Sequence, residues 1–226
     1  MCGRYSFSTS REKLKEQFHQ VQVGDTLKMN FNIAPTQPGY VITDDQPHQL
    51  QSFVWGLVPF WAKDRKIGSR LINARAESIA DKPSFRQAVR RRRCWVLADS
   101  FYEWKTINGK KQPYRILSQA EELLVMAGIW EVWKKEGHSV YSYAIITTEP
   151  NQDVMSIHDR MPVILHDSHQ RSTWLGAENF EEALDQLHPP PDHTLRMYPV
   201  STRVNNVRNN DPTLHEPLEE QGDLFS

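Results

Sequence analysis

The feature that most constrains the fold is a set of stretches rich in β-branched and aromatic residues, each lying between turn-forming clusters. Such residues favour β-strands because their side chains pack well on a pleated surface. Asn108-Gly109 favours a tight two-residue turn and predicts a hairpin between the stretches on either side of it. Strands therefore dominate the predicted structure. The predicted strands cover residues 40–43, 49–57, 101–106, 112–117, 123–133 and 139–148.

Helical patterns are few and scattered. Residues 9–12, Thr-Ser-Arg-Glu, resemble a capping box, and Leu14 with Phe18 forms an apolar pair at helical spacing, so we predict a helix that runs to about residue 20. Residues 83–92 and 180–187 also have helical patterns, and three prolines at 189–191 end the second helix. We predict an α+β fold, with a curved antiparallel β-sheet or barrel-like core and peripheral helices.

Length and composition indicate one compact unit. The chain has 226 residues, 38% hydrophobic and 24% charged, which fits a single domain over residues 1–210. Residues 211–226 carry five acidic residues and no Lys or Arg, so we predict a disordered acidic tail. No apolar run approaches the roughly 18 residues that span a bilayer. Charged residues at 11–13 interrupt any signal-peptide core. We expect a monomer in the cytoplasm, without membrane contact.

The first five residues, Met-Cys-Gly-Arg-Tyr, place Cys2 directly after the initiator methionine. Removal of Met1 would give Cys2 both a free α-amine and a thiol. The reference pKa is roughly 7.7–8.0 for the amine and about 8.5 for the thiol, so a fraction of each is nucleophilic near neutral pH. Such a residue can capture an aldehyde twice, because the amine forms an imine and the thiol then closes a thiazolidine ring. The alternative is a small residue near a disordered start.

Polar residues gather inside four otherwise apolar stretches, at residues 71–77, 98–104, 157–162 and 199–201. Each has a simpler structural explanation. Glu103 is either a functional carboxylate or a strand side chain that faces water, and residues 158–160 are either part of a site or a local cluster of ion pairs.

Six sequence blocks carry a more specific signal through their order and spacing. They are MCGRY at 1–5, FNIAP at 31–35, WGLVPFW at 55–61, INARAE at 72–77, EW at 103–104 and IHDRMP at 157–162. Together they resemble the SRAP family, the SOS-response-associated abasic-site processing proteins. The resemblance extends from residue 1 to about residue 209.

The resemblance implies a sensor of abasic sites in single-stranded DNA that forms a covalent thiazolidine crosslink through Cys2 and shields the lesion during replication. It also implies that Asn73, Glu103 and His158 sense or stabilise the opened abasic sugar. The chemistry agrees, because an abasic deoxyribose is mostly a closed hemiacetal and a general acid or base must help it open. An imidazole and a carboxylate supply that proton transfer, and the Asn73 amide can both donate and accept hydrogen bonds.

DNA contacts are expected in and near the same blocks. Arginines grip phosphates bidentately, and a tryptophan on which a base stacks contributes roughly 1–3 kcal/mol. For Trp61 and Trp104, packing in the core is the alternative to base stacking. A lost base cannot be read by its edge, so we expect recognition of a gap and a backbone. The arginines at 90–93 lie outside the matched blocks, and we interpret them as a solvated helix face. The predicted contacts are Gly3, Arg4, Asn32, Trp61, Arg75, Trp104, Arg160 and Ser201.

Two other functions stay open. Glutamine amidotransferases also begin Met-Cys-Gly, so an amino-terminal-nucleophile amidohydrolase or peptidase that uses Cys2, including self-processing that exposes Cys2, is the main alternative. A DNA-binding module without chemistry is the second, and retention of Met1 would favour it. We expect no cofactor and no metal, because His166 and His169 lack the further ligands of a zinc set.

The far end of the chain contains Gln-Gly-Asp-Leu-Phe at Gln221–Phe225. This segment resembles the short peptides by which bacterial repair and replication proteins dock on the sliding clamp, typically Gln-Leu-Ser/Asp-Leu-Phe. Gly222 replaces the usual leucine, so a clamp contact would be weak. A chance match in a disordered tail is the alternative.

Overall fold

The computed structural model describes residues 2–24 and 26–218, and its strands form two β-sheets. The strands are β1 (Tyr5–Phe7), β2 (Asn30–Ile33), β3 (Pro38–Thr43), β4 (Gln46–Trp55), β5 (Asn73–Arg75), β6 (Arg93–Ala98), β7 (Ser100–Ile107), β8 (Lys110–Ser118), β9 (Leu124–Lys135), β10 (His138–Thr148), β11 (Met161–Pro162) and β12 (Leu195–Pro199). The α-helices are α1 (Arg11–Gln17), α2 (Arg86–Arg91), α3 (Ser168–Gly176) and α4 (Phe180–Leu184). Short 3-10 helices are η1 (Arg65–Arg70), η2 (Ala76–Ser78), η3 (Thr202–Asn205) and η4 (Pro212–His215).

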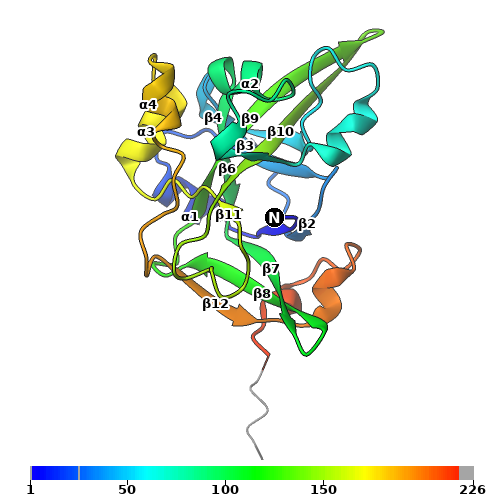
Figure 1. Cartoon of the computed structure of the whole chain (residues 1–226), viewed down its shortest axis with the longest axis vertical. Coiled ribbons are helices and arrows are strands. Elements are labelled where there is room, and N and C mark those ends of the chain that lie inside the picture. The colour runs from blue at the N-terminus through cyan, green and yellow to red at the C-terminus, as the bar shows by residue number, and fades with distance from the viewer. Residues whose placement is uncertain (1, 25, 219–226) are drawn as a thin grey trace, which may run out of the picture.

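Five strands close into a barrel in the order β10, β4, β3, β6 and β9, with β9 pairing back onto β10. Closure leaves no long open edge. The short strands β5 and β11 pair with the later part of β10. Figure 1 shows the barrel in the upper part of the molecule, with α2 above it and α3 and α4 on one side. The predicted α+β class with a barrel-like core and peripheral helices is confirmed.

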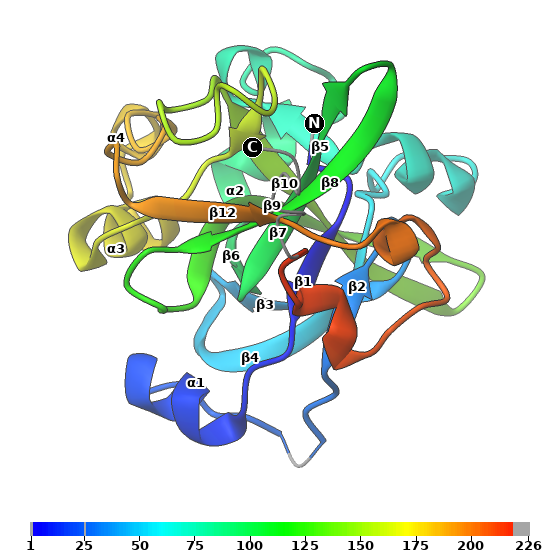
Figure 2. The same ribbon diagram turned by 90° about the horizontal axis from the view of Figure 1, so that it is seen from below.

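The second sheet has the order β12, β8, β7, β1 and β2, and all of its pairings are antiparallel. Figure 2 shows this sheet from below, with β1 between β7 and β2. The predicted hairpin is confirmed as β7 and β8, and its turn residues Asn108 and Gly109 have φ angles of 50° and 75°. Both angles lie in the left-handed region that such a turn requires. The first strand of the chain, β1, is therefore an interior strand of this sheet, paired on both sides.

Aromatic packing in the core fixes the start of β1. The Tyr5 ring meets the Trp55 ring edge to face at 5.1 Å between centroids, a contact that adds roughly 0.5–1.5 kcal/mol to the burial of both rings. The Tyr5 hydroxyl lies 2.5 Å from the Tyr143 hydroxyl of β10. A Cβ on Gly39 would fall 1.9 Å from the Tyr5 hydroxyl oxygen, so only glycine fits there. Tyr5 thus holds the chain in place three residues after Cys2.

Several details of the structure differ from the predicted elements. The barrel sheet is mixed, because β10 runs parallel to β4 and to β5. Helix α1 starts later and ends earlier than predicted, at Arg11 and Gln17. Its cap is Ser10, whose hydroxyl accepts a hydrogen bond from the Lys13 amide at 3.2 Å, so Thr9 does not form the predicted capping box.

Residues 211–218 pack on the fold, in contrast to the predicted start of a tail at 211. Leu214 of η4 is buried, and the Leu218 amide donates to the Pro199 carbonyl at 2.9 Å. Arg203 pairs with Asp211 at 2.8 Å. Buried apolar surface and paired charges order this acidic segment. The predicted clamp motif at Gln221–Phe225 lies outside the described residues.

The arginine run does not form one solvated helix face, because α2 ends at Arg91. Arg92 forms an ion pair with the buried Glu131 at 2.6 Å. Arg93 begins β6, is 6% exposed, and donates from Nε and Nη2 to the carbonyls of Trp174 and Ala177, each at 2.6 Å. The second half of the run therefore anchors α3 and β9. Within residues 2–24 and 26–218, no helix has the length and apolar character to cross a bilayer.

Candidate functional site

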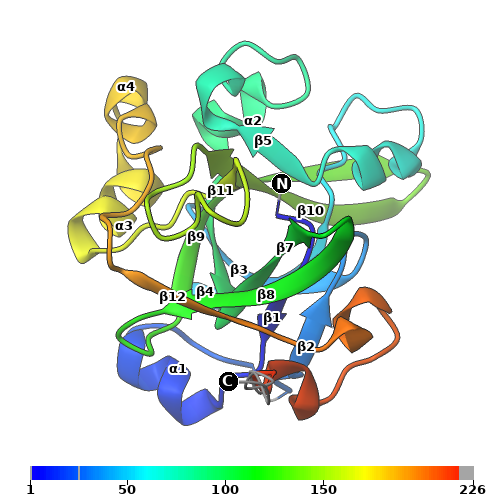
Figure 3. The same cartoon turned by 60° about the horizontal axis from the view of Figure 1, so that its bottom comes forward.

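Cys2 lies three residues before the start of β1 and is fully buried. Its carbonyl accepts a hydrogen bond from Asn73 Nδ2 at 2.7 Å, and its thiol faces the Arg4 carbonyl at 3.8 Å. That same Arg4 carbonyl accepts from the Tyr102 amide at 2.9 Å, which ties the start of the chain to β7. Figure 3 shows the start of the chain between β5, β7 and β10. Both sheets therefore contribute to the surroundings of Cys2.

Asn73 is the first residue of β5 and pairs in register with Ile145 of β10. Its amide nitrogen holds the Cys2 carbonyl. Its Oδ1 atom is buried and accepts no hydrogen bond from the described residues. Asn73 thus holds the Cys2 carbonyl and has one buried acceptor without a partner among the described residues.

Glu103 is a buried carboxylate on β7, with a side chain that is 3% exposed. The alternative of a strand side chain facing water is therefore wrong. Desolvation raises the pKa of the Glu103 carboxyl, and the nearby His158 opposes this rise only in part. Burial also raises the pKa of the Cys2 thiol, and the charge of Glu103 raises it further. The thiol is therefore protonated at neutral pH and needs a base, while the Glu103 carboxylate is more basic than usual.

His158 follows a turn after β10, and its imidazole ring lies near the Glu103 carboxylate. Its Nε2 atom lies 3.9 Å from Glu103 Oε2. Its Nδ1 atom lies 2.9 Å from Asp159 Oδ1 and accepts a hydrogen bond from the Arg160 amide at 2.9 Å. The four residues predicted to carry the chemistry therefore come together, although they are far apart in the sequence. The cluster combines a nucleophile, an amide and two proton-transfer groups.

The side chains of Arg4 and Asn32 form hydrogen bonds to the segment after β12. Arg4 Nη1 donates to Asn32 Oδ1 at 2.7 Å and to the Val204 carbonyl at 2.6 Å. Asn32 is 1% exposed, and its Nδ2 donates to the carbonyls of residues 204, 206 and 209. Its side chain cannot reach DNA as predicted, because it is buried and all of its polar atoms are bonded. Asn32 therefore has a structural role and holds the segment at residues 204–209.

The other predicted DNA contacts differ in how much surface they offer. Trp61 is 49% exposed and Arg75, at the end of β5, is exposed. Trp104 is half-buried and its indole donates to Asn205 Oδ1 at 2.7 Å. Gly3 is half-buried next to Cys2, and the Ser201 hydroxyl caps η3 by accepting from the Arg203 amide at 3.3 Å.

Arg160, a further predicted contact, is bound by partners within the protein. Its side chain is 14% exposed, and Nη1 and Nη2 bind the two carboxylate oxygens of Glu77 at 2.6 and 3.0 Å.

Sequence reasoning missed an exposed basic and aromatic surface around Trp61. Phe60 is also 49% exposed. An adjoining cavity of about 550 Å³ is lined by Trp61, Lys63, Lys66 and Arg70, among others. The signal was present in the sequence, because Lys and Arg recur at residues 63–70 directly after the matched tryptophan block.

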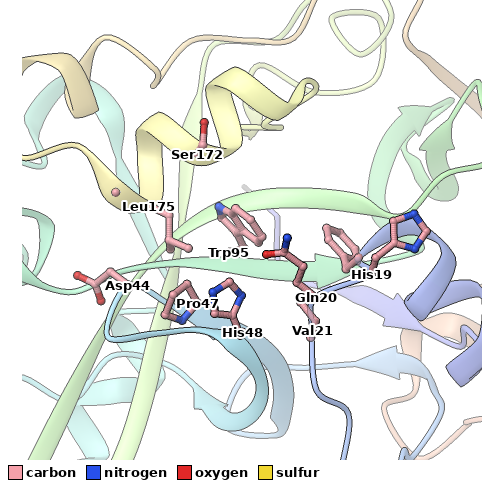
Figure 4. A pocket seen from close by; sticks show the side chains of 11 residues that line it. His19, Gln20, Val21, Asp44, Pro47, His48, Trp95, Ser172 and Leu175 are labelled. Atoms are coloured by element: carbon pink, nitrogen blue, oxygen red, sulfur yellow. The ribbon is translucent and has the colours of Figure 1, made fainter.

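A separate cavity of about 440 Å³ lies between the end of α1, the β3–β4 hairpin and α3. Figure 4 shows Trp95 and Leu175 above Pro47 and His48, with His19 to one side. None of the residues that line it belongs to the cluster around Cys2. The described residues hold no group of three or more His, Cys, Asp or Glu side chains that could bind a metal. His166 instead contacts Gln170 and Asp167.

Comparisons with known proteins agree with the six sequence blocks. A family model described as SOS response associated peptidase (SRAP) matches residues 1–207. The abasic site processing protein YoqW of Bacillus subtilis is 42% identical over 96% of this chain and 99% of its own length. The abasic site processing protein HMCES of Gallus gallus is 32% identical over 97% of this chain and 78% of its own length. A crystal structure of a protein from Bacteroides thetaiotaomicron matches with a TM-score of 0.86 at 27% identity, over 96% of this chain and all of that one. The protein therefore belongs to the SRAP family.

Proposed function

We propose that this protein processes abasic sites in single-stranded DNA by forming a covalent bond to the lesion through Cys2, after Met1 has been removed. Relatives such as YoqW and HMCES are named abasic site processing proteins, and they align over nearly the whole of this chain. The observation that carries the proposal is the convergence of Cys2, Asn73, Glu103 and His158 from separate segments. Abasic-site processing is a single reaction that uses all four of these side chains.

The covalent step joins the ring-opened sugar to the aminothiol. The α-amine of Cys2 attacks the C1′ aldehyde and forms an imine with loss of one water molecule. The thiol then adds to the imine carbon and transfers its proton to the nitrogen, which closes a thiazolidine. No oxidant or cofactor enters this balance.

The surroundings divide the proton transfers between two groups. Burial disfavours the Cys2 thiolate, so the thiol must lose its proton to a nearby base as it attacks. The Glu103 carboxylate, with its raised pKa, suits that task. His158 can assist ring opening of the hemiacetal. The unused Asn73 Oδ1 atom can accept a hydrogen bond from the hydroxyl that ring opening produces.

Binding of the strand is assigned to the exposed groups around this cluster. Arg75 meets backbone phosphates, and Trp61 gives a base next to the gap a surface for stacking. An intact duplex keeps its bases stacked and paired, so it enters poorly. The bound protein then covers the lesion during replication. It acts as a single-domain monomer in the cytoplasm and joins the nucleoid when it is bound to DNA.

The test is a crosslinking assay with single-stranded DNA that contains one abasic site. We expect a band shift that resists denaturant, and no shift with intact DNA of the same sequence. Changing Cys2 to Ala removes the thiol and abolishes the stable adduct, whereas Cys2→Ser forms at most a transient imine. A Cys2→Ala protein that crosslinks as stably as the parent refutes the thiazolidine.

The name SOS response associated peptidase motivates a narrower second activity, the release of Met1 by the protein itself. Cys2 would then act as the nucleophile of an autoproteolytic step that exposes its own amine. The measurement is the intact mass of protein made by cell-free translation without methionine aminopeptidase. Loss of Met1 in the parent but not in Glu103→Gln supports self-processing, and retention in both rules it out. A glutaminase assay tests the amidohydrolase alternative in the same samples.

A further inference from the structure

We propose that the segment from Phe60 to Arg70, which we call the η1 platform, binds the unpaired strand on one side of the abasic nucleotide. The contact extends beyond the single base that Trp61 stacks. The inference rests on the proposed function, because it adds a second contact for the same strand. Figure 1 shows the platform, in cyan, at the upper right beside β10.

Positive charge without internal partners is concentrated on the platform. Four basic residues stand against one acid, Asp64, in a chain whose formal net charge is −1. All four are exposed, and none forms an ion pair or a side-chain hydrogen bond with the part of the chain that the structure describes. A polyanion can therefore bind them without displacing a partner. The four residues are Lys63, Arg65, Lys66 and Arg70.

Two exposed aromatic rings stand at the start of the platform. Phe60 and Trp61 are each 49% exposed, whereas Ala62 directly after them is buried. The Ala62 carbonyl accepts from the Trp133 indole of β9 at 2.8 Å, and both residues belong to a small apolar core of their own. The backbone that carries the two rings is therefore fixed to the barrel. A fixed surface lowers the entropy that is lost when a base stacks on it.

Two cavities flank η1 and share part of their lining. One, of about 550 Å³, is lined by Trp61 among others, and the second, of about 430 Å³, is lined by Arg65 among others. Lys66 and Ser69 line both cavities. Both volumes lie within the range of pockets that bind small molecules. Successive nucleotides can therefore occupy the two cavities, with the phosphate that joins them over Lys66 and Ser69.

The platform is joined closely to the covalent site. A Cβ on Gly68 would lie 2.6 Å from the Gly56 carbonyl oxygen, so η1 packs backbone to backbone against the end of β4. Asn73, which holds the Cys2 carbonyl, follows three residues after Arg70. The platform lies on the barrel, whereas Trp104 belongs to the second sheet. The two flanks of the lesion therefore meet different surfaces.

The first experiment locates the contact along the strand. The Kd is measured for oligonucleotides with one tetrahydrofuran abasic analogue, which cannot crosslink, while the flank is shortened from the 5′ or the 3′ end. The parent is expected to lose affinity with one flank that meets the platform. The triple variant Lys63→Gln/Lys66→Gln/Arg70→Gln should bind the longest oligonucleotide about 10- to 100-fold more weakly at about 0.15 M salt and lose its dependence on that flank alone.

The matched control is Lys13→Gln/Lys15→Gln/Lys28→Gln, which removes the same charge from exposed residues on and after α1. Figure 2 shows α1 on the opposite side of the molecule from η1. The control should keep the parent's Kd, and both variants should keep its unfolding temperature because the side chains are exposed. Equal Kd values for the two variants overturn the proposal. A loss that is the same at every length, including strands cut beside the analogue, also overturns it.

A second experiment needs no lesion, so it stands even if the parent does not crosslink and the proposed function fails. The Kd for an intact single strand is measured from about 50 to about 200 mM salt. Each lost phosphate contact should lower the slope of log K against log salt by about 0.7, so the triple variant should lose about 2. Phe60→Ala should weaken binding by about 5- to 150-fold with an unchanged slope, because base stacking is not ionic. A triple variant with the parent's slope, or a Phe60→Ala protein with the parent's Kd, overturns the proposal.

Discussion

Replacing Asn32 by Ala tests whether this matched residue supports the site or contacts DNA. The side chain is 1% exposed and makes four hydrogen bonds, one accepted from Arg4 and three donated to the carbonyls of residues 204, 206 and 209. Two of those carbonyls keep another donor, because Arg4 also binds Val204 and the Asn209 amide binds Asn206. The uncompensated losses are the charge-assisted bond from Arg4 and the bond to the residue 209 carbonyl.

The expected cost follows from these two losses. A hydrogen bond to a charged group contributes about 1.5–3 kcal/mol and a neutral one about 1 kcal/mol, so Asn32→Ala should lower the free energy of unfolding by roughly 2–4 kcal/mol. For a chain of this size that corresponds to a fall of about 5–15 °C in Tm. Denaturant titration and calorimetry measure both quantities.

The control is Asn206→Ala, which removes an exposed side chain whose Oδ1 only accepts from the Arg208 amide at 3.1 Å. It should cost less than about 1 kcal/mol. The reasoning is refuted if Asn32→Ala is as stable as Asn206→Ala but binds single-stranded DNA at least tenfold more weakly, because Asn32 would then contact DNA directly.

Three further predictions concern titrating groups and the chain end. Burial lowers the pKa of His215 from 6.5 to about 4, so the unfolded chain binds the extra proton first and stability should fall as pH drops from about 6.5 to about 4; His215→Phe should flatten that part of the stability curve. Because desolvation raises the pKa of Glu103, its ionised form destabilises the fold, so Glu103→Gln should raise the Tm at pH 7, lose this advantage below about pH 4, and slow crosslinking by roughly 10²- to 10⁴-fold. A fluorescent peptide covering residues 216–226 should bind the bacterial sliding clamp weakly, and a version with Leu224 and Phe225 both changed to Ala should not; equal, non-saturating signals would exclude the tether.

Local patterns in the sequence predicted the local parts of the fold. The β7–β8 hairpin follows from Asn108-Gly109, because that turn requires positive φ angles within a few residues. The parallel pairing of β10 with β4 and β5 joins residues about 70 or more positions apart, and no short-range pattern encodes such a pairing. Barrel closure therefore had to come from the structure.

The arginines and Asn32 show the same limit for single residues. Four consecutive arginines suggest a solvated helix, yet the helix ends inside the run and the strand that follows turns Arg93 inward. Asn32 and Arg160 lie in matched blocks, but the partners that they bind, residues 204–209 and Glu77, lie 83 or more positions away in the sequence. A motif shows that a residue matters, whereas only the fold shows which partner it meets.

The most direct test of the central claim is the intact mass of the product formed with an oligonucleotide that contains one abasic site. The account predicts an adduct whose mass is that of the protein without Met1 plus that of the oligonucleotide, less one water molecule, and peptide mapping that places the link on Cys2. An adduct that retains Met1, or a link that maps to a lysine in the parent protein, would contradict it.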